Sequence, residues 1–381
     1  MKNRATLIYS LLQACFWSAW AAMFGYASAY LLAAGLSSFR IGIVMGICSL
    51  ASALVQPLLA GLMDHTQHRY LKFCIILLCL ASAGLCTALL VIPQPPAGML
   101  FGLSAGLLQL AAPLVNSLAA ENADTDFGVA RGVGSLGYAV IFPVIGWLSA
   151  WWKPDAAVLS AVLTFIGTAV FVHLFPAAGF VPAEPEKQTA EPTPFLTRYR
   201  SFMLVLGGVL FLYISHVFLG NYGYQIVLSK GGDSAAYGTG GSIAALFELP
   251  VMFFFARFLQ KRPASFWVRI CGFSFFLKAL IITLASSMTG YYAAMVMQLT
   301  GWGMIQVASV YYVNEVIAPA DAVRGQSLFT SALALATVIG SFAGGWLIDA
   351  LSVQALTVGA SLLAALGALI VFLCMKPGHR A

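Results

Sequence analysis

The sequence predicts an all-α polytopic membrane protein with twelve membrane-spanning helices in two bundles of six. Three observations support this prediction. Of the 381 residues, 61% are hydrophobic and only 8% are charged, against roughly 25% charged residues in a soluble domain. The hydrophobic residues form long segments with few charges, and one polar, proline-rich segment divides these into two groups. A soluble protein of this composition would lack the charges that its surface needs, so we expect lipid as the solvent.

Each predicted span is a mostly apolar segment of at least about 20 residues, the length that crosses a hydrocarbon core of about 30 Å. The first group comprises residues 7–33, 41–63, 71–92, 98–120, 129–152 and 156–175. The second group comprises residues 202–228, 237–259, 266–285, 291–313, 326–350 and 353–375. The intervening segment 177–200 has the composition of a flexible cytoplasmic linker. We therefore expect an N-terminal bundle over residues 1–176 and a C-terminal bundle over residues 201–381.

The distribution of charge predicts how the chain crosses the membrane. The net charge of +6 comes from 19 Lys and Arg against 13 Asp and Glu. With both termini in the cytoplasm, most of the basic residues fall in inner loops, as the positive-inside rule requires. We expect a multi-pass protein of the plasma membrane, in a bacterium the inner membrane. Its partners would be the lipid bilayer, a small-molecule substrate and a proton. We expect a functional monomer with no nucleic-acid partner.

Weak internal similarity indicates that the two bundles are related. Ala130-Arg131-Gly132 opens the fifth predicted span, and Val323-Arg324-Gly325 opens the eleventh. Pro57 in the second span and Pro250 in the eighth are separated by the same distance along the chain. Transporters are commonly built from such repeats and hold the substrate between them near the middle of the membrane.

Ionisable residues near the middle of a span are the strongest functional candidates, because each costs about 2.5–3.5 kcal/mol at a helix centre on insertion scales. Glu248 is the one acidic residue in such a position, and Lys278 lies at similar depth in the next span. We predict that these two residues couple transport to a proton. The alternative is a structural ion pair between two helices.

Other polar residues within the spans are candidates for substrate binding. They are Arg131, Asn116, His216, Asn221 and Gln298. The alternative for the amides, and for Gln306, is that they hydrogen-bond neighbouring helices; the same alternative holds for a neutral His216. Among the many aromatic residues, Trp17, Trp20 and Trp302 lie well inside spans and could contact substrate.

The loop after the second span offers a candidate conformational latch. Gly61 allows close helix approach, Asp64 lies at the cytoplasmic end of the span, and Arg69 follows five residues later. Such a charge group can hold one arrangement of two bundles. The alternative is an ordinary solvated loop.

Two segments resemble the major facilitator superfamily, and the resemblance extends over essentially the whole chain. Residues 61–71 are similar to its signature between the second and third helices, with His65 and Gln67 in place of an Arg and a Gly. Residues 127–138, Phe-Gly-Val-Ala-Arg-Gly-Val-Gly-Ser-Leu-Gly-Tyr, resemble the start of the fifth helix in the group of lactose permeases, phenylpropionate permeases and nucleoside:proton symporters. The resemblance implies the major facilitator fold.

The resemblance also implies roles for individual residues. Arg131 matches an arginine that hydrogen-bonds substrate, Glu248 a carboxylate used in sugar binding and coupling, and Lys278 an arginine of the ninth helix. Asn116 lies where the lactose permease has a carboxylate. Gln298, with the glycine three residues later, lies where a His and a Glu are expected.

These observations predict a secondary active transporter that imports a polar solute, such as a sugar or nucleoside, by proton-coupled symport and alternating access. Protonation of Glu248 would remove its desolvation cost and permit an occluded state. We expect no cofactor and no metal. An aromatic-acid or drug transporter of the same fold is one alternative; a transport-derived sensor or a membrane-embedded enzyme is another. Against an enzyme, no span carries clustered His and Asp residues, and no Walker-type loop is present.

Overall fold

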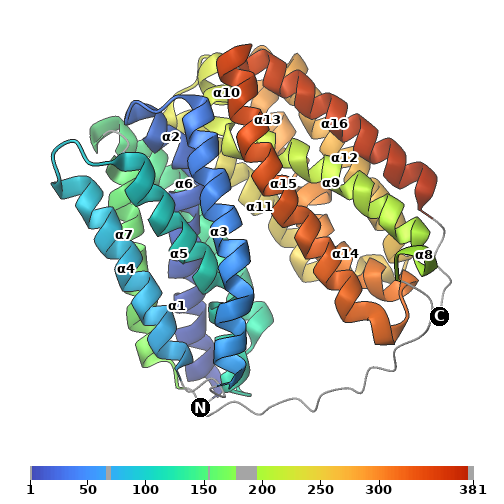
Figure 1. Cartoon of the computed structure of the whole chain (residues 1–381), viewed down its shortest axis with the longest axis horizontal. Coiled ribbons are helices and arrows are strands. Elements are labelled where there is room, and N and C mark those ends of the chain that lie inside the picture. Colours follow the sequence, from blue (N-terminus) through green and yellow to red (C-terminus); the bar gives the residue numbers. More distant parts are fainter. Residues whose placement is uncertain (1, 66–69, 153–154, 177–194, 376–381) are drawn as a thin grey trace. The chain divides into compact units, whose positions relative to one another are not determined.

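The structure, a computed structural model, describes residues 2–65, 70–152, 155–176 and 195–375, and their regular secondary structure is helical throughout (Figure 1). Within these ranges, 11 helices are long and apolar enough to cross a membrane. The remaining predicted span, residues 237–259, coincides with the 26-residue helix α11 (Ser234–Leu259). The predicted all-helical polytopic architecture is confirmed.

Contacts between residues divide the chain into two compact units, Met1–Ala183 with Gly232–Ser242 and Glu184–Gly231 with Ile243–Ala381. The helices of the first unit are α1 (Lys2–Trp20), η1 (Ala21–Gly25), α2 (Ala27–Ala33), α3 (Ser38–His65), α4 (Leu71–Val91), α5 (Ala97–Leu118), η2 (Ala119–Glu121), α6 (Phe127–Trp152) and α7 (Asp155–Leu174). Besides most of α11, the second unit contains α8 (Phe195–Arg198), α9 (Arg200–Asn221), α10 (Gly223–Ser229), α12 (Ala264–Leu284), α13 (Met288–Val296), η3 (Leu299–Gly303), α14 (Met304–Val316), η4 (Pro319–Asp321), α15 (Ala322–Ala350) and α16 (Val353–Cys374).

Three of the predicted spans are interrupted helices. Residues 7–33 form α1, the π-helical turn η1 and α2, while residues 291–313 fall in α13, the π-helical turn η3 and α14. Residues 202–228 form α9 and α10. Hydropathy reports apolar length and is insensitive to such breaks. Of the three, the π-helical turns η1 and η3 are of a kind that frequently marks functional sites. Of the predicted linker 177–200, residues 195–198 are helical and α9 begins at Arg200; residues 177–194 lie outside the described residues.

The same packing partners recur in the two units. Helix α1 packs on α6 and α7, as α9 packs on α15 and α16. Helix α4 packs on α5 and α7, as α12 packs on α14 and α16. Glycine permits close approach in both units: a Cβ atom at Gly137 of α6 would lie 2.8 Å from the carbonyl oxygen of Ala14 in α1, and one at Gly367 of α16 would lie 2.6 Å from the carbonyl oxygen of Gly208 in α9. The recurring partners support the internal repeat seen in the sequence.

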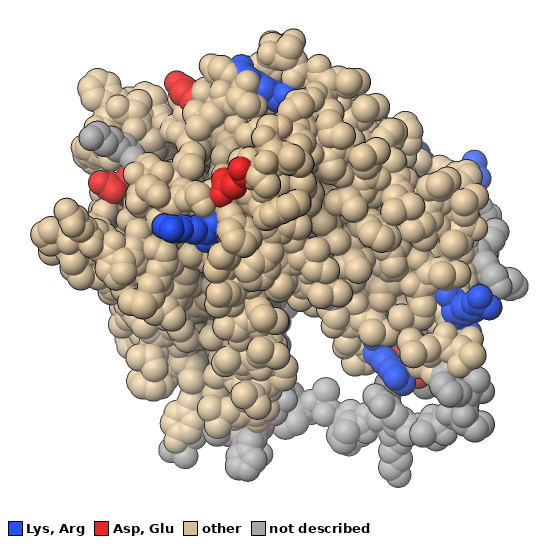
Figure 2. Space-filling view, turned by 45° about the horizontal axis from the view of Figure 1, so that its top comes forward, with Lys and Arg blue, Asp and Glu red and all other residues tan. Residues whose placement is uncertain are grey.

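The surface is suited to lipid rather than water. The face shown in Figure 2 is almost entirely uncharged, with Lys, Arg, Asp and Glu in a few places. Large apolar side chains are exposed along the spans, such as Leu58 of α3 at 74% and Leu362 of α16 at 66%. Apolar exposure on this scale, with backbone polar groups paired within helices, is expected for a protein in a bilayer. The chain is a multi-pass membrane protein.

The first turns of α11 belong to the first unit, although the sequence assigns this helix to the C-terminal bundle. The hydroxyl of Tyr237 donates a hydrogen bond to the carbonyl oxygen of Gly25 at 2.6 Å. Ser242 donates to the carbonyl oxygen of Ala139 in α6 at 2.8 Å. Residues 232–242 are thus held by the N-terminal helices at the end of η1 and along α6.

Candidate functional site

A chain of hydrogen bonds in the second unit joins the two mid-membrane charges through an amide. The Nζ of Lys278 in α12 donates to Oε1 of Gln298 at 2.5 Å. The Nε2 of Gln298 donates to Oε1 of Glu248 in α11 at 3.0 Å. Lys278 and Gln298 are each 7% exposed, and Glu248 is half-buried. The structure thus brings together three predicted site residues, and Gln298 links the cation to the carboxylate.

The π-helical turn η3 positions Gln298 for this link. The backbone N–H of Gly303 donates to the carbonyl oxygen of Gln298 at 2.9 Å, a bond across five residues that widens the helix. A Cβ atom at Gly303 would lie 3.1 Å from both Cα and Cγ of Glu248. The missing side chain therefore allows η3 to approach α11 closely enough for the amide to reach the carboxylate.

An aromatic cluster lies next to this chain. The imidazole of His216 in α9 stacks on the indole of Trp302, with ring centroids 4.3 Å apart and planes inclined by 7°. It also contacts Phe275 of α12 edge-on at 5.6 Å. The Nδ1 atom of His216 is buried and has no hydrogen-bond partner among the described residues. Phe275 is about one helical turn from Lys278, and Trp302 is about one helical turn from Gln298. Because His216 contacts both aromatic residues, it lies beside the hydrogen-bonded chain.

In the first unit, Arg131 of α6 lies over an aromatic side chain of α1. Its guanidinium carbon is 3.9 Å from the ring centroid of Trp17. One of its N–H groups donates to the Ser135 hydroxyl at 2.9 Å. A Cβ atom at Gly134 would lie 2.6 Å from the Trp17 side chain, so glycine is needed for this contact. Cation–π contact and the hydrogen bond together fix the orientation of the guanidinium.

A buried network behind Arg131 fixes Trp17 in turn. The indole N–H of Trp17 donates to Oε1 of Gln13 at 2.8 Å, and Nε2 of Gln13 donates to the Tyr9 hydroxyl at 2.8 Å. Tyr9 donates to the carbonyl oxygen of Val115 in α5 at 2.8 Å. Sequence reasoning did not select Tyr9 or Gln13. Their four-residue spacing with Trp17, which places all three on one helix face, was the available signal.

The remaining predicted site residues lie elsewhere. Asn221 donates through its side-chain amide to the Ser341 hydroxyl at 2.9 Å, a contact between α9 and α15. Asn116 is exposed near the end of α5. Of the predicted latch, Gly61 is exposed in α3, whereas Arg69 and the side chain of Asp64 lie outside the described residues.

Comparisons with known proteins agree with this architecture. The model of the MFS_1 like family matches residues 7–357. A structure of a single-residue mutant of the nucleoside transporter NupG superposes with a TM-score of 0.78 at 14% identity, covering 98% of this chain and 99% of that one. An auto-inhibited POT family peptide transporter gives a TM-score of 0.74 at 10% identity, covering 99% of both chains.

A third structure, a single-residue mutant of the peptide transporter POT in complex with alafosfalin, gives 0.74 at 13% identity, covering 97% of this chain and 93% of that one. No curated protein matches the sequence. At these identities the superpositions show a shared fold, and the resemblance to the major facilitator superfamily is confirmed. The match of the family model over nearly the whole length establishes that this chain belongs to the MFS_1 like family of transporters with the major facilitator fold.

Proposed function

We propose that this secondary transporter imports a polar small solute, such as a sugar or nucleoside, together with a proton by alternating access. The hydrogen-bonded chain from Lys278 through Gln298 to Glu248 carries the proposal. Intramembrane ionisable groups are costly and commonly mark proton relays or substrate pathways. The hydrogen bonds link such groups in three different helical segments. Protonation of one group would therefore change the bonds that hold these segments together and so shift the helices.

In the proposed coupling step, Glu248 gains and loses the proton. When Glu248 is ionised, its carboxylate accepts from Nε2 of Gln298, whose Oε1 accepts from Lys278. In this proposal Lys278 sets how readily Glu248 holds its proton. A proton on a carboxylate oxygen neutralises Glu248, weakens its hydrogen bond to Gln298, and lowers the cost of enclosing the site in a dry, occluded state.

The groups around this chain suit a neutral solute with hydroxyls. An acid, an amine and an amide offer both donors and acceptors, and the stacked pair of Trp302 and His216 supplies an apolar face for a ring. In the first unit, the guanidinium of Arg131, which is held by Trp17 and Ser135, would donate to hydroxyl oxygens of the solute. The likeness to a structure described as a nucleoside transporter agrees with this substrate class. Asn116 and Asn221 remain further candidates for contact with substrate.

The orientation of the chain is part of the proposal. Basic residues in the predicted inner loops favour cytoplasmic termini and, in a bacterium, the inner membrane. In this orientation the end of α3 that carries Gly61 and Asp64 would face the cytoplasm, and we propose that these two residues form the latch with Arg69. We propose that one chain is the functional unit.

The test begins with purified protein and a panel of sugars, nucleosides and aromatic acids, each scored by its shift of the melting temperature. The stabilising solute is then supplied to proteoliposomes under an imposed proton gradient or an imposed sodium gradient. We expect a sugar or nucleoside to bind and to accumulate only with the proton gradient. Accumulation with sodium alone would contradict proton coupling. Binding without accumulation would indicate a sensor, and stabilisation by aromatic acids alone would indicate the alternative substrate class.

A further inference from the structure

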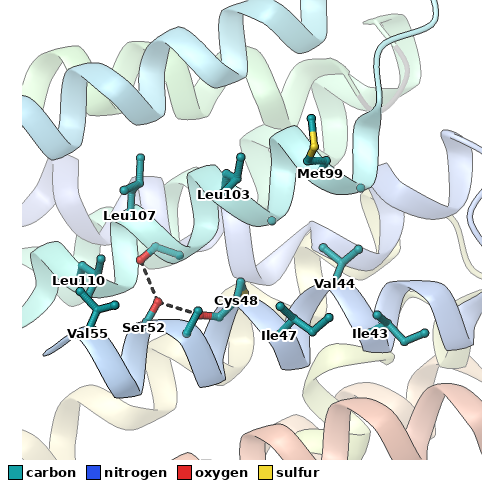
Figure 3. Close-up of a pocket in the computed structure, with 14 residues that line it drawn as sticks. Ile43, Val44, Ile47, Cys48, Ser52, Val55, Met99, Leu103, Leu107 and Leu110 are labelled. Carbon is teal, nitrogen blue, oxygen red and sulfur yellow. Dashed lines mark hydrogen bonds between the residues drawn. The ribbon is translucent and has the colours of Figure 1, made fainter.

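A groove in the first unit runs along the contact between α3 and α5 (Figure 3). Its volume is about 360 Å³. In Figure 3, Ile43, Ile47 and Val55 of α3 face it from one side and Met99 and Leu103 of α5 from the other. None of the residues that line the groove is among those assigned to proton coupling or substrate binding.

Where α3 and α5 pack together, one side of their contact is polar and the other side, which faces the groove, is apolar. On the polar side, Nε2 of Gln109 donates to the Ser49 hydroxyl at 3.4 Å, and Gln56 donates to the carbonyl oxygen of Gln109 at 3.3 Å. On the groove side, the proton of the Ser52 hydroxyl is already used, because it is shared between the carbonyl oxygens of Cys48 and Gly106, which lie 2.8 and 3.0 Å from Oγ. The groove therefore presents hydrocarbon to an occupant and offers it little hydrogen bonding.

The length of the groove matches one leaflet of a bilayer. Helix α3 has 28 residues, about 42 Å at 1.5 Å per residue, and so extends past a hydrocarbon core of about 30 Å. The residues from Ile43 to Val55 that line the groove cover about 18 Å of this length. Half of the core, the depth of one leaflet, is about 15 Å.

A basic side chain lies on the groove face at the end of α3. Arg40 is in the first turn of the helix and is exposed. It precedes Val44, Ile47, Ala51 and Val55 at spacings of three or four residues, which place all five on one helix face. The groove thus begins next to a cation at the expected boundary between hydrocarbon and headgroups.

We propose that this groove binds one acyl chain of an anionic phospholipid, whose phosphate contacts Arg40. The apolar lining, the leaflet-length walls and the single cation at one end complement the two parts of such a molecule. A zwitterionic lipid would fill the same groove but gain less from the cation. The site would fix a lipid on the transporter along α3 and α5.

The test uses native mass spectrometry of full-length protein released from nanodiscs containing equal amounts of phosphatidylglycerol and phosphatidylcholine with identical acyl chains. We expect wild-type protein to retain phosphatidylglycerol in preference to phosphatidylcholine by about fivefold, the factor that one basic residue contributes near an anionic surface. Arg40→Gln should abolish the preference while Arg40→Lys preserves it. Because Arg40 is exposed, neither variant should impair folding.

A second pair of variants tests the groove itself. Ala51 is exposed and lines the groove, so Ala51→Trp should fill it and remove most of the retained lipid. Ala81→Trp, at an exposed position in the middle of α4, is the matched control and should retain lipid as wild type does. Unchanged retention by Ala51→Trp, or an unchanged preference in Arg40→Gln, would overturn the proposal. Dimers of wild-type protein that Ala51→Trp dissociates would also overturn it, because a second copy would then be the occupant.

Discussion

The link between Lys278 and Glu248 can be measured with a double-mutant cycle of Lys278→Gln and Glu248→Gln. Two hydrogen bonds, of 2.5 and 3.0 Å, connect the Lys278 ammonium to the Glu248 carboxylate, and the side-chain amide of Gln298 lies between them. Adding the amide makes the path roughly 8 Å long, and at an effective dielectric constant of about 20 the attraction over this distance is about 2 kcal/mol. We therefore expect a coupling energy of about 2 kcal/mol in the free energy of unfolding.

The assay is equilibrium unfolding of the purified variants in detergent, with transport measured in parallel. Each single variant leaves an uncompensated buried charge or an altered partner and should be destabilised, whereas the double variant should recover stability because no unpaired charge remains. Lys230→Gln combined with Glu248→Gln is the control pair. Lys230 donates to the carbonyl oxygen of Ala285, so its effect should add to that of Glu248→Gln within about 0.5 kcal/mol.

Two results would refute the reasoning. A coupling energy below about 0.5 kcal/mol, the scatter of independent sites, would show that the charges do not interact through this chain. Recovery of both stability and transport in the double variant would show that the pair is a structural ion pair, and Glu248 would lose its role in coupling. We expect stability to recover and uphill transport to remain lost.

The remaining predictions concern the first unit. Arg131→Lys should weaken solute binding by more than about tenfold, about 1.4 kcal/mol, at unchanged melting temperature, because lysine cannot reproduce the guanidinium fork; near-normal affinity in equilibrium binding would remove Arg131 from the site. Gln13→Leu should lower the unfolding free energy by about 1–3 kcal/mol, since two buried hydrogen bonds lose their partner, whereas Gln354→Leu at an exposed position should change it by less than about 0.5 kcal/mol. Tyr237→Phe, which removes the hydrogen bond to Gly25, should cost about 0.6 kcal/mol, the average for such bonds in membrane proteins; no loss in denaturation would show that this bond does not hold residues 232–242.

Sequence reasoning identified the spans and the mid-membrane charges because both depend on the cost of polar groups in lipid. Glu248 and Lys278 were identified from depth alone, and Gln298 from its polarity within a span. The bridging position of Gln298 could not be predicted, because it depends on the π-helical turn η3 and on the close approach of Gly303 to α11. Hydropathy carries no information on either.

The network behind Arg131 was missed for a different reason. Gln13 is fully buried and uses both atoms of its amide, one toward Tyr9 and one toward Trp17. In the sequence it is one polar residue among many in apolar segments, and its importance emerges when α6 places Arg131 over Trp17. The assignment of residues 232–242 to the first unit likewise depends on tertiary contacts that a count of spans does not include.

Glu248→Gln in proteoliposomes provides the most direct test of proton-coupled transport by this site. Counterflow exchange and uphill accumulation driven by a proton gradient are measured on the same preparation, with Asp155→Asn, an exposed carboxylate at the start of α7, as the matched control. We expect Glu248→Gln to retain exchange and lose uphill accumulation, while Asp155→Asn retains both. Uphill accumulation at the wild-type rate in Glu248→Gln would contradict proton coupling through Glu248.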